Sequence, residues 1–564
     1  IDLGQLQEAE LYLRKAIEIQ PDFAEAYCDL GKALLALGQS QEAERYLRKA
    51  VEIQPDLAKA NSNLGVTLIT LGKTQEAEIS LRKAIELKPD SVGAHSNLGS
   101  LLMDLDRLEQ AKKVFYKCIE LQPTEINHIS KLLNVLTDLC AWDEIEKFLP
   151  YVERIGINGK AVNPLILMYL EDNPENHLKR AIKYSQEGKR ESLPFQSSYN
   201  NSKINIGYFS SDFRLHSLSI LLTRILELHD SSKFNIYAYS LNKTSDSYTE
   251  RIKNAVFCFR DIADYSDMEI VNIARKDKID VAIDLNGITS LNRKSIFDYR
   301  VAPIQINYLG YPGTMGSKSF DYIIADKILI PEENKKFFTE KVLYLPNSCV
   351  PIDNTLKISS NKFNRDKLGL PSNGFIFTCF NNPKKIGRKE FNIWMNLLQK
   401  VDGSFLWIVK PHTEAINNIY NELSKHGLKK ERIIFAEKMN FNDHFSRHLY
   451  GDLSLDTFNY TAGTTAVLAL YAGLPHITRT GQGFNTRGGA SILNACNLNE
   501  LITHNDSEYE SLAYELATNK EKLTLIRNKL KTKESPFFNS SQFTIDLENL
   551  YVKIMNSEKV KDKN

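Results

Sequence analysis

An interval of 34 residues organises the first 125 positions of this chain. A turn residue recurs at that interval and precedes Gln-Glu-Ala or Glu-Gln-Ala each time, at Gly4, Gly38, Gly72 and Asp106. A proline recurs at the same interval, at Pro21, Pro55, Pro89 and Pro123. Proline ends a helix because it lacks the backbone donor. Each unit is therefore predicted to be a helical hairpin, which buries its apolar face only by stacking on its neighbours.

The repeat has a recognisable pattern. Leu-Gly pairs mark the first helix of each complete unit, at residues 30–31, 64–65 and 98–99. Period and pattern resemble tetratricopeptide repeats, which implies protein binding. Asp29, Asn63 and Asn97 occupy one repeat position. They either form a ladder that hydrogen-bonds a peptide backbone in the inner groove or belong to an ordinary solvated face, and both readings stay open.

The repeat boundaries give the first domain limits. The chain begins without Met and part-way through a repeat. We therefore expect an N-terminally truncated array over residues 1–124. The strict period ends there, while helical patterns continue over 129–139, 142–155, 162–169 and 181–187. Residues 125–200 are expected to form degenerate helical repeats and a linker that pack the superhelix onto the next domain.

After residue 203 strands alternate with helices, which indicates doubly wound α/β domains. The first series of predicted strands is 204–209, 235–239, 256–259, 281–285, 305–309, 322–325 and 342–345. The second is 375–380, 405–409, 433–435, 453–455, 476–478 and 501–503. We expect a first Rossmann-like half over 201–350, a connecting loop over 351–374, a second half over 375–556 and a disordered tail over 557–564. The predicted fold is an α-solenoid followed by two Rossmann-like halves with a cleft between them, the GT-B-type architecture that suits a nucleotide-sugar transferase.

Composition excludes several functions. The net charge of +1 gives no general attraction to nucleic acid or anionic membranes. The sequence contains no run of about 18 apolar residues, so no membrane-spanning helix is predicted. Seven cysteines without a C-x-x-C pair argue against disulfides or structural zinc and fit a reducing, cytoplasmic compartment.

Residues 453–475 form the most informative stretch of the second half. Leu453–Leu455 is predicted to be a buried strand, 459–463 a turn, and Thr464 the start of an apolar helix. A helix N-terminus with free amides binds anions, and two threonine hydroxyls add donors. The stretch is either a diphosphate seat or one more strand-to-helix turn of an α/β sheet.

Six motifs then occur in order after the repeats. They are residues 207–216, 284–287, 302–305, 309–314, 380–382 with Lys385, and 463–465. Together they resemble the protein O-GlcNAc transferases, in a bacterial form with only a short loop between the halves. The resemblance implies inverting transfer of N-acetylglucosamine from UDP-GlcNAc to Ser/Thr hydroxyls. It implies acceptor proteins bound by the repeats, and neither metal nor other cofactor.

The resemblance also assigns roles to residues. Lys385 matches the lysine that neutralises the departing diphosphate, although it could be a surface lysine beside Lys384. His216 matches a histidine that lines the sugar and acceptor cleft, either orienting the acceptor or acting as a base. The donor's own phosphate is another candidate for the base. The donor-binding set is completed by residues at the sugar wall, the nucleotide and the diphosphate seat: Leu309, Gly310, Pro312, Asn382, His444, Arg447, Gly463, Thr464 and Thr465.

Some positions depart from the family pattern. Gly463 stands where a histidine is common, Leu468 where an acidic residue is suited to ribose, and Ile288 where His or Tyr is common. His444 and Arg447 could equally belong to a solvated helix face that also bears His448. These departures leave two alternatives open. One is a protein O-fucosyltransferase that uses GDP-fucose, and the other is a peptide-binding scaffold with a decayed transferase half.

Overall fold

The computed structural model describes residues 3–196, 198–289, 292–361 and 363–561. It divides into two compact units, Ile1–Leu139 and Cys140–Asn564. Within the described ranges, no helix combines the length and the apolar character needed to cross a membrane.

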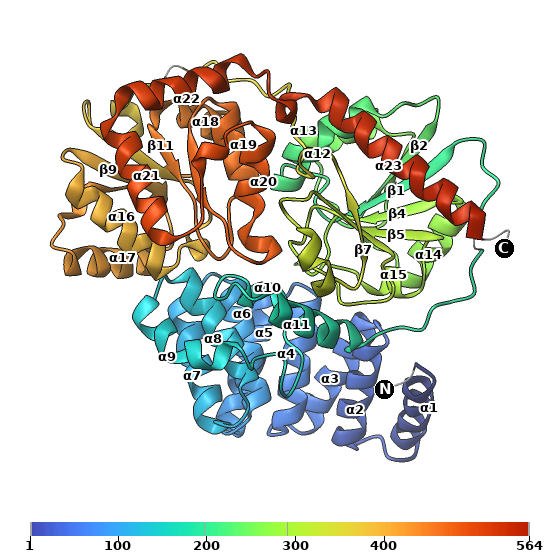
Figure 1. The fold of residues 1–564 in the computed structure, drawn as a ribbon. Coiled ribbons are helices and arrows are strands. Elements are labelled where there is room, and N and C mark those ends of the chain that lie inside the picture. The colour runs from blue at the N-terminus through green and yellow to red at the C-terminus, as the bar shows by residue number, and fades with distance from the viewer. Residues whose placement is uncertain (1–2, 197, 290–291, 362, 562–564) are drawn as a thin grey trace. The chain divides into compact units, whose positions relative to one another are not determined.

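The first unit is a series of antiparallel helices (Figure 1). They are α1 (Leu3–Ile19), α2 (Ala24–Ala36), α3 (Ser40–Ile53), α4 (Ala58–Thr70), α5 (Thr74–Leu87), α6 (Val92–Asp104), α7 (Leu108–Leu121) and α8 (Asn127–Asp138). The period is confirmed at the turns, because Gly38, Gly72 and Asp106 all have positive φ. Gly4 is an exception to the predicted turn, since it lies inside the first turn of α1.

The Leu-Gly pairs mark where the helices of a hairpin touch. A Cβ atom added to Gly31 would lie 2.4 Å from Leu47 Cγ, and one added to Gly99 would lie 2.7 Å from the Phe115 ring. Only glycine permits this approach of α2 to α3 and of α6 to α7. The repeated glycine is therefore explained by packing rather than by a turn.

The second unit begins with helices that the sequence assigns to degenerate repeats. They are α9 (Trp142–Val152), α10 (Pro164–Leu167) and α11 (Pro174–Gln186). Trp142 Nε1 donates to the carbonyl of Ile386 at 2.9 Å, and its ring lies 4.6 Å from that of Phe391. Helix α9 therefore packs on the second α/β half of the same unit, whereas the Ser185 hydroxyl of α11 donates to the Gly316 carbonyl of the first half at 2.6 Å.

The first α/β half is built on a parallel sheet of order β3-β2-β1-β4-β5-β6-β7 in the described residues. Its strands are β1 (Ile204–Ser210), β2 (Phe234–Ser240), β3 (Cys258–Asp261), β4 (Val281–Asp284), β5 (Ile304–Asn307), β6 (Tyr322–Ala325) and β7 (Lys341–Tyr344). The helices are α12 (Ser217–Leu228), α13 (Ser247–Ala255), α14 (Asp267–Lys276) and α15 (Ser295–Asp298), with the 3₁₀ turn η1 (Glu332–Phe337).

The second half repeats this design with the parallel order β10-β9-β8-β11-β12-β13 among the described residues. Its strands are β8 (Phe375–Cys379), β9 (Ser404–Val409), β10 (Ile433–Ala436), β11 (Leu453–Leu455), β12 (His476–Arg479) and β13 (Ile502–Thr503). The helices are α16 (Arg388–Lys400), α17 (Thr413–Lys425), α18 (Phe441–Ser446), α19 (Thr464–Tyr471), α20 (Gly488–Ala495), α21 (Asp506–Thr518) and α22 (Lys520–Thr532). Short 3₁₀ turns are η2 (Asp366–Leu368), η3 (Pro383–Lys385), η4 (Lys430–Arg432), η5 (Arg447–Tyr450), η6 (Phe484–Thr486), η7 (Asn499–Leu501) and η8 (Pro536–Phe538).

The strand orders of the two sheets indicate where each half would bind a ligand. In an open parallel sheet a ligand binds outside the carboxyl ends of the strands, where the strand order reverses. That point lies between β1 and β4 in one sheet and between β8 and β11 in the other. Every predicted strand is present, although the predicted strand 256–259 is shifted to Cys258–Asp261.

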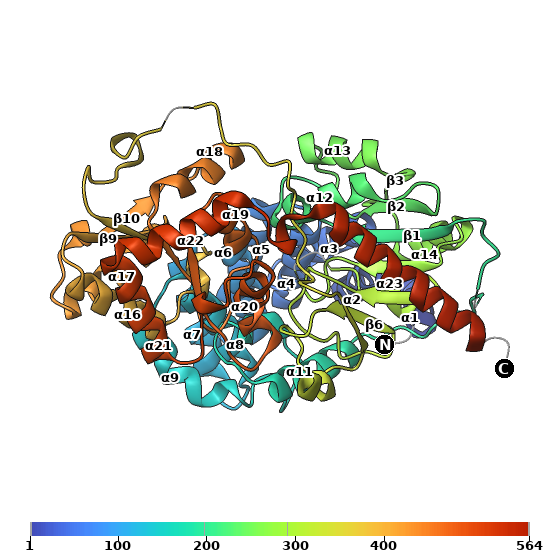
Figure 2. The same cartoon turned by 45° about the horizontal axis from the view of Figure 1, so that its top comes forward.

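The last helix, α23 (Ser540–Lys561), contradicts the expected domain limits. It lies beside α12 of the first half in both views (Figure 1, Figure 2). Leu547, Tyr551 and Ile554 are buried in the core around β1 and β4, and the hydroxyls of Tyr551 and Tyr208 are 3.0 Å apart. The apolar stripe of α23 therefore completes the first core. The predicted disordered tail is wrong up to Lys561, and residues 562–564 lie outside the described residues.

Candidate donor-diphosphate site

A fully buried carboxylate organises the turn after β11. Asp456 follows the strand directly and has no exposed surface. Its Oδ1 accepts the backbone N–H groups of Thr457 at 2.8 Å and Ala462 at 2.7 Å, and its Oδ2 accepts the Thr478 hydroxyl at 2.7 Å. By binding two amides of one loop, Asp456 fixes residues 457–462 into a single conformation.

Lys385 lies against this loop. It ends η3, the turn that follows β8, and its side chain is half-buried. Its Nζ donates to the Thr461 carbonyl at 3.4 Å and lies 4.0 Å from the centre of the Tyr460 ring. Burial lowers the pKa of Lys385 to about 8, against the opposing attraction of Asp456 and of Cys379. The surface-lysine reading is therefore wrong: this is a partly desolvated cation at the strand-order reversal of the second sheet.

The N-terminus of α19 completes the candidate diphosphate-binding site. Gly463 is the N-cap residue, and no described side chain caps the helix there. The first-turn amides of α19 consequently have no partner within the helix. The hydroxyls are already engaged: Thr464 donates to the Ser217 carbonyl at 3.4 Å, and Thr465 donates to Asn381 Oδ1. The structure therefore presents the amides and Lys385 to an anion, and the predicted contact of the Thr464 and Thr465 hydroxyls with a diphosphate stays a prediction.

Asn381 ties the lysine turn to this helix. Its Nδ2 donates to Thr457 Oγ1 at 2.8 Å and to Asp456 Oδ1 at 3.3 Å, while its Oδ1 accepts from Thr465. Asn382, by contrast, is exposed, and its side chain accepts the Lys384 amide at 3.1 Å. Asn382 thus caps η3, and its predicted contact with a nucleotide stays a prediction.

The predicted nucleotide residues lie on α18 and η5, above the ring of Phe380. The Arg447 guanidinium is 4.6 Å from that ring, and its Nη1 donates to the Glu437 carbonyl at 2.7 Å. Arg447 and His448 are buried, so the solvated-face reading is wrong. Burial lowers the pKa of His444 to about 2 and of His448 to about 4, so both rings are neutral at pH 7.

His216 lies after β1 and is the N-cap residue of α12. Its Nδ1 accepts the Leu218 amide at 3.3 Å and lies 3.7 Å from Asp212 Oδ2. Because Nδ1 accepts, the neutral ring carries its proton on Nε2. Burial lowers the pKa of His216, with Arg214 acting in the same direction and Asp212 against it. His216 therefore offers a hydrogen-bond donor near neutral pH.

The loop after β4 supports this histidine. Asn286 is buried, and its Nδ2 donates to Ser211 Oγ at 2.8 Å and to Asp212 Oδ2 at 3.1 Å. Asp284 accepts the amides of Asn286 and Gly287 at 2.9 and 3.0 Å, and burial raises its pKa to about 6. The ends of β1 and β4 are thus joined through polar side chains.

The predicted sugar wall, made of Leu309, Gly310 and Pro312, follows β5. Leu309 has a φ of +68°, which an L-residue rarely adopts. A Cβ atom on Gly310 would lie 1.9 Å from the Leu285 carbonyl oxygen. Gly310 is therefore required for the contact between the loops after β4 and β5. Ile288, the other departure in this half, is buried in the core of the sheet.

The two carboxyl edges meet within this unit. The Thr464–Ser217 hydrogen bond joins the first residues of α19 and α12. Tyr460 packs against the core cluster of the first half that contains Tyr311. The structure therefore brings Lys385, the α19 amides, His216 and the β5 loop into one region. Sequence reasoning missed Asp456, Asn381 and Tyr460 as members, although their positions in the turns that follow β8 and β11 were a usable signal.

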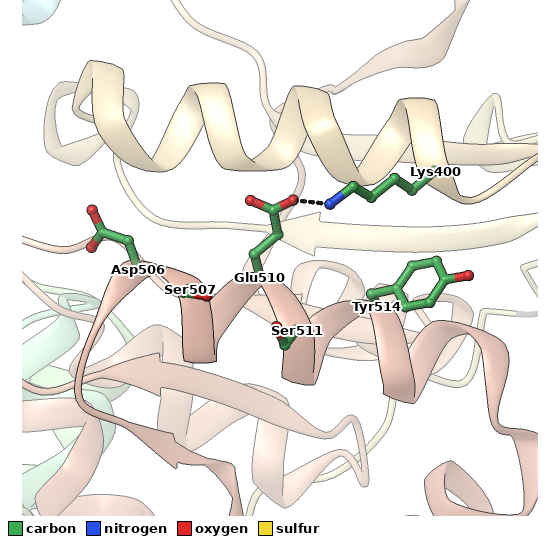
Figure 3. Close-up of a pocket in the computed structure, with 6 residues that line it drawn as sticks. All are labelled: Lys400, Asp506, Ser507, Glu510, Ser511 and Tyr514. Carbon is green, nitrogen blue, oxygen red and sulfur yellow. Dashed lines mark hydrogen bonds and ion pairs between the residues drawn. The ribbon is translucent and has the colours of Figure 1, made fainter.

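One groove of the second half lies outside this region. A groove of about 750 Å³ between α16 and α21 is crossed by the ion pair of Lys400 and Glu510, whose atoms are 2.6 Å apart (Figure 3). None of the predicted site residues lines it.

Among the described residues, no group of three or more His, Cys, Asp or Glu side chains is arranged to hold a metal ion.

The chain is similar to several known proteins. Curated relatives include the probable UDP-N-acetylglucosamine–peptide N-acetylglucosaminyltransferase SEC of Arabidopsis thaliana, 31% identical over 373 residues that cover 64% of this chain and 38% of the relative. SPINDLY of Petunia hybrida carries the same enzyme name and is 31% identical over 375 residues, covering 63% and 39%. The chain spans about two fifths of the length of these relatives.

A mutant of the Thermobaculum terrenum O-GlcNAc transferase has the same fold, with a TM-score of 0.69 at 22% identity over 95% of this chain and 98% of that one. Tetratricopeptide-repeat models match residues 22–90 and 92–125. The model described as glycosyl transferase family 41 matches residues 183–356 and 353–547. Because that match covers more than half of the sequence, this chain belongs to glycosyl transferase family 41.

Proposed function

We propose that the chain transfers N-acetylglucosamine from UDP-GlcNAc to serine or threonine hydroxyls of proteins. The observation that carries the proposal is the half-buried Lys385 ammonium beside the free amides of α19, at the strand-order reversal of the second sheet. Charge that develops on a leaving diphosphate is stabilised best by such preorganised donors. The names of the curated relatives support this donor and do not favour GDP-fucose.

In the proposed reaction the acceptor hydroxyl oxygen attacks the anomeric carbon. The bond between that carbon and the β-phosphate oxygen breaks, and its electron pair leaves with UDP. Lys385 and the α19 amides receive the new negative charge. Attack opposite to the leaving group inverts the configuration of the sugar. No metal is needed in this proposal, because the protein supplies the cationic partner itself.

His216 is proposed to orient the acceptor. Its Nδ1 caps α12, so the neutral ring presents Nε2–H as a donor rather than a lone pair as a base. The hydroxyl proton would then pass to an oxygen of the donor's own phosphate. Leu309, Gly310 and Pro312 would wall the sugar, and His444 with Arg447 would lie against the nucleotide. The repeats would hold the acceptor protein.

A donor panel tests the proposal. The purified chain is incubated with an acceptor peptide library and either UDP-GlcNAc or GDP-fucose, and the mass added to each peptide is measured. We expect addition of one N-acetylhexosamine from UDP-GlcNAc alone. Transfer from GDP-fucose alone would support the other donor. A chain that neither transfers nor hydrolyses either donor, and binds neither in calorimetry, would favour the scaffold reading.

The His216→Ala variant is expected to lose transfer more than donor hydrolysis. Transfer kcat/KM should fall about 10²-fold, because the acceptor loses its orienting donor. Loss of the helix cap should also lower stability by about 1 kcal/mol. His216→Asn keeps a capping side chain and should restore the stability without the full activity. An equal loss in hydrolysis and transfer would place His216 on the donor instead.

Activity should decline at alkaline pH. Lys385 acts as an ammonium, and its pKa in the free enzyme is lowered to about 8. The charged form is present below that pKa and is lost above it, so kcat/KM should fall as pH rises through about 8. A pH profile of kcat/KM measures this decline. The Lys385→Arg variant should lack this alkaline limb, because arginine stays protonated. An unchanged limb in that variant would assign the titration to another group.

A further inference from the structure

The Lys385 ammonium rests on an aromatic ring that is itself supported by a second ring. Lys385 Nζ lies 4.0 Å from the centre of the Tyr460 ring. The Tyr460 ring stacks on that of Tyr169, with centroids 5.0 Å apart and planes 24° apart. A cation above the face of an aromatic ring is attracted by the ring's negative quadrupole, most strongly where water is excluded. The two rings therefore form a base beneath the proposed leaving-group cation.

The second ring belongs to a segment far away in the sequence. Tyr169 follows α10, and its backbone carbonyl accepts Asn459 Nδ2 at 3.2 Å. The Met168 carbonyl accepts Asn485 Nδ2 at 3.2 Å. Segment 168–172 is thus bonded to the loop that carries Tyr460 and to the loop after β12.

Asp172 anchors the other end of this segment. Its Oδ2 accepts the Gln482 amide at 2.7 Å, and its Oδ1 accepts the Gly483 amide at 2.6 Å and the Thr486 hydroxyl at 3.1 Å. A carboxylate with two backbone donors and one hydroxyl holds its loop strongly, since charge-assisted hydrogen bonds are about twice as strong as neutral ones. Neither end of the segment can move without breaking these bonds.

We propose that Tyr460 and Tyr169 are positioning residues for Lys385, and that segment 168–172 locks this two-ring support in place. The support combines the attraction of the Tyr460 ring face for the ammonium with the fixed position of that ring. Tyr460 fixes the ammonium beside the Thr461 carbonyl, and Tyr169 prevents the Tyr460 ring from turning away. The inference rests on the proposed function, because the position of Lys385 matters to catalysis only if a diphosphate leaves there.

A graded series at position 460 tests the proposal without changing the shape of the site. Tyr460→Phe is the reference, and 4-fluoro- and 3,4,5-trifluorophenylalanine are then incorporated at the same position. Fluorine weakens the negative face of the ring while nearly preserving its size. Asp456 and Cys379, the other groups that act on Lys385, stay unchanged.

Two readouts separate this inference from the proposed function. The first is the pKa of Lys385 in the enzyme without donor, obtained from acetylation rates at varied pH by mass spectrometry. It should fall stepwise with fluorination, because the charged form loses stabilisation. The second is transfer kcat/KM, which should fall about threefold or more from the reference to the trifluoro variant. A constant pKa across the series would overturn the proposal. If the Lys385 pKa falls stepwise but no member of the series transfers sugar, the support of Lys385 by the rings stands and the proposed function is contradicted.

Position 169 provides the matched comparison. Tyr169→Phe keeps the stack and should retain the Lys385 pKa and kcat/KM of the wild type. Tyr169→Ala removes the stack and should lower transfer kcat/KM about tenfold, mainly through kcat, with the acetylation profile of Lys385 altered. If Tyr169→Ala changes thermal stability but neither kcat nor the profile, the ring serves folding alone and the proposal fails.

Discussion

The Lys385→Ala variant is expected to lose transfer activity by about 10³-fold or more in kcat/KM, because one preorganised oxyanion donor alone contributes about 10²–10³. Lys385 brings a full charge to the turn after β8, and its ammonium already lies at the Thr461 carbonyl and over the Tyr460 ring. The fold should survive, since removal of a desolvated cation relieves a burial penalty. Radiolabelled sugar transfer and near-ultraviolet circular dichroism measure the two effects.

Lys389→Ala is the matched control. Lys389 is exposed on α16, four residues along the chain from Lys385. The Lys389→Ala variant should transfer sugar at the wild-type rate. Residual transfer above about one tenth of wild type in Lys385→Ala would remove this lysine from the mechanism, because a tenfold loss corresponds to only about 1.4 kcal/mol.

The Asp456→Ala variant is expected to destabilise the second half by about 3–5 kcal/mol and to abolish transfer. The substitution leaves the amides of Thr457 and Ala462 and the Thr478 hydroxyl without their buried acceptor. It also removes the negative charge that faces Lys385. Denaturant unfolding followed by the fluorescence of the buried Trp394 and Trp407 reports the stability of this half.

Asp456→Asn separates the two roles of this carboxylate. The amide oxygen can still accept the two backbone N–H groups, and the Thr478 hydroxyl can turn to accept from the new amide nitrogen. Stability should therefore recover by more than half, while transfer stays at least about tenfold below wild type because Lys385 loses its countercharge. Full activity in Asp456→Asn would show that the carboxylate only holds the loop.

The elements were predictable because their signals are local. The 34-residue repeat, the apolar strands and the turn before Thr464 each follow from a few neighbouring residues. The strand order was not encoded locally, yet the doubly wound pattern implied it. The packing of α23 on the first half was missed, because its apolar stripe does not reveal which core it enters.

The site was predictable in part for the same reason. Lys385 and the start of α19 are marked by motifs, whereas Asp456 looked like an ordinary strand end. Its role emerges only when the Ala462 amide folds back onto it. The contact between Tyr169 and Tyr460 joins segments that are 291 residues apart in the chain, so no sequence window contains it. The engaged hydroxyls of Thr464 and Thr465 likewise depend on partners from other elements.

The central claim concerns where a donor diphosphate binds, and a crystal structure of the chain with UDP tests it most directly. We predict that the β-phosphate lies within hydrogen-bonding distance of Lys385 Nζ and of the first amides of α19. We also predict that the uracil and ribose lie toward His444 and Arg447. A diphosphate bound elsewhere, with Lys385 still on the Tyr460 ring and the α19 amides unoccupied, would contradict the account.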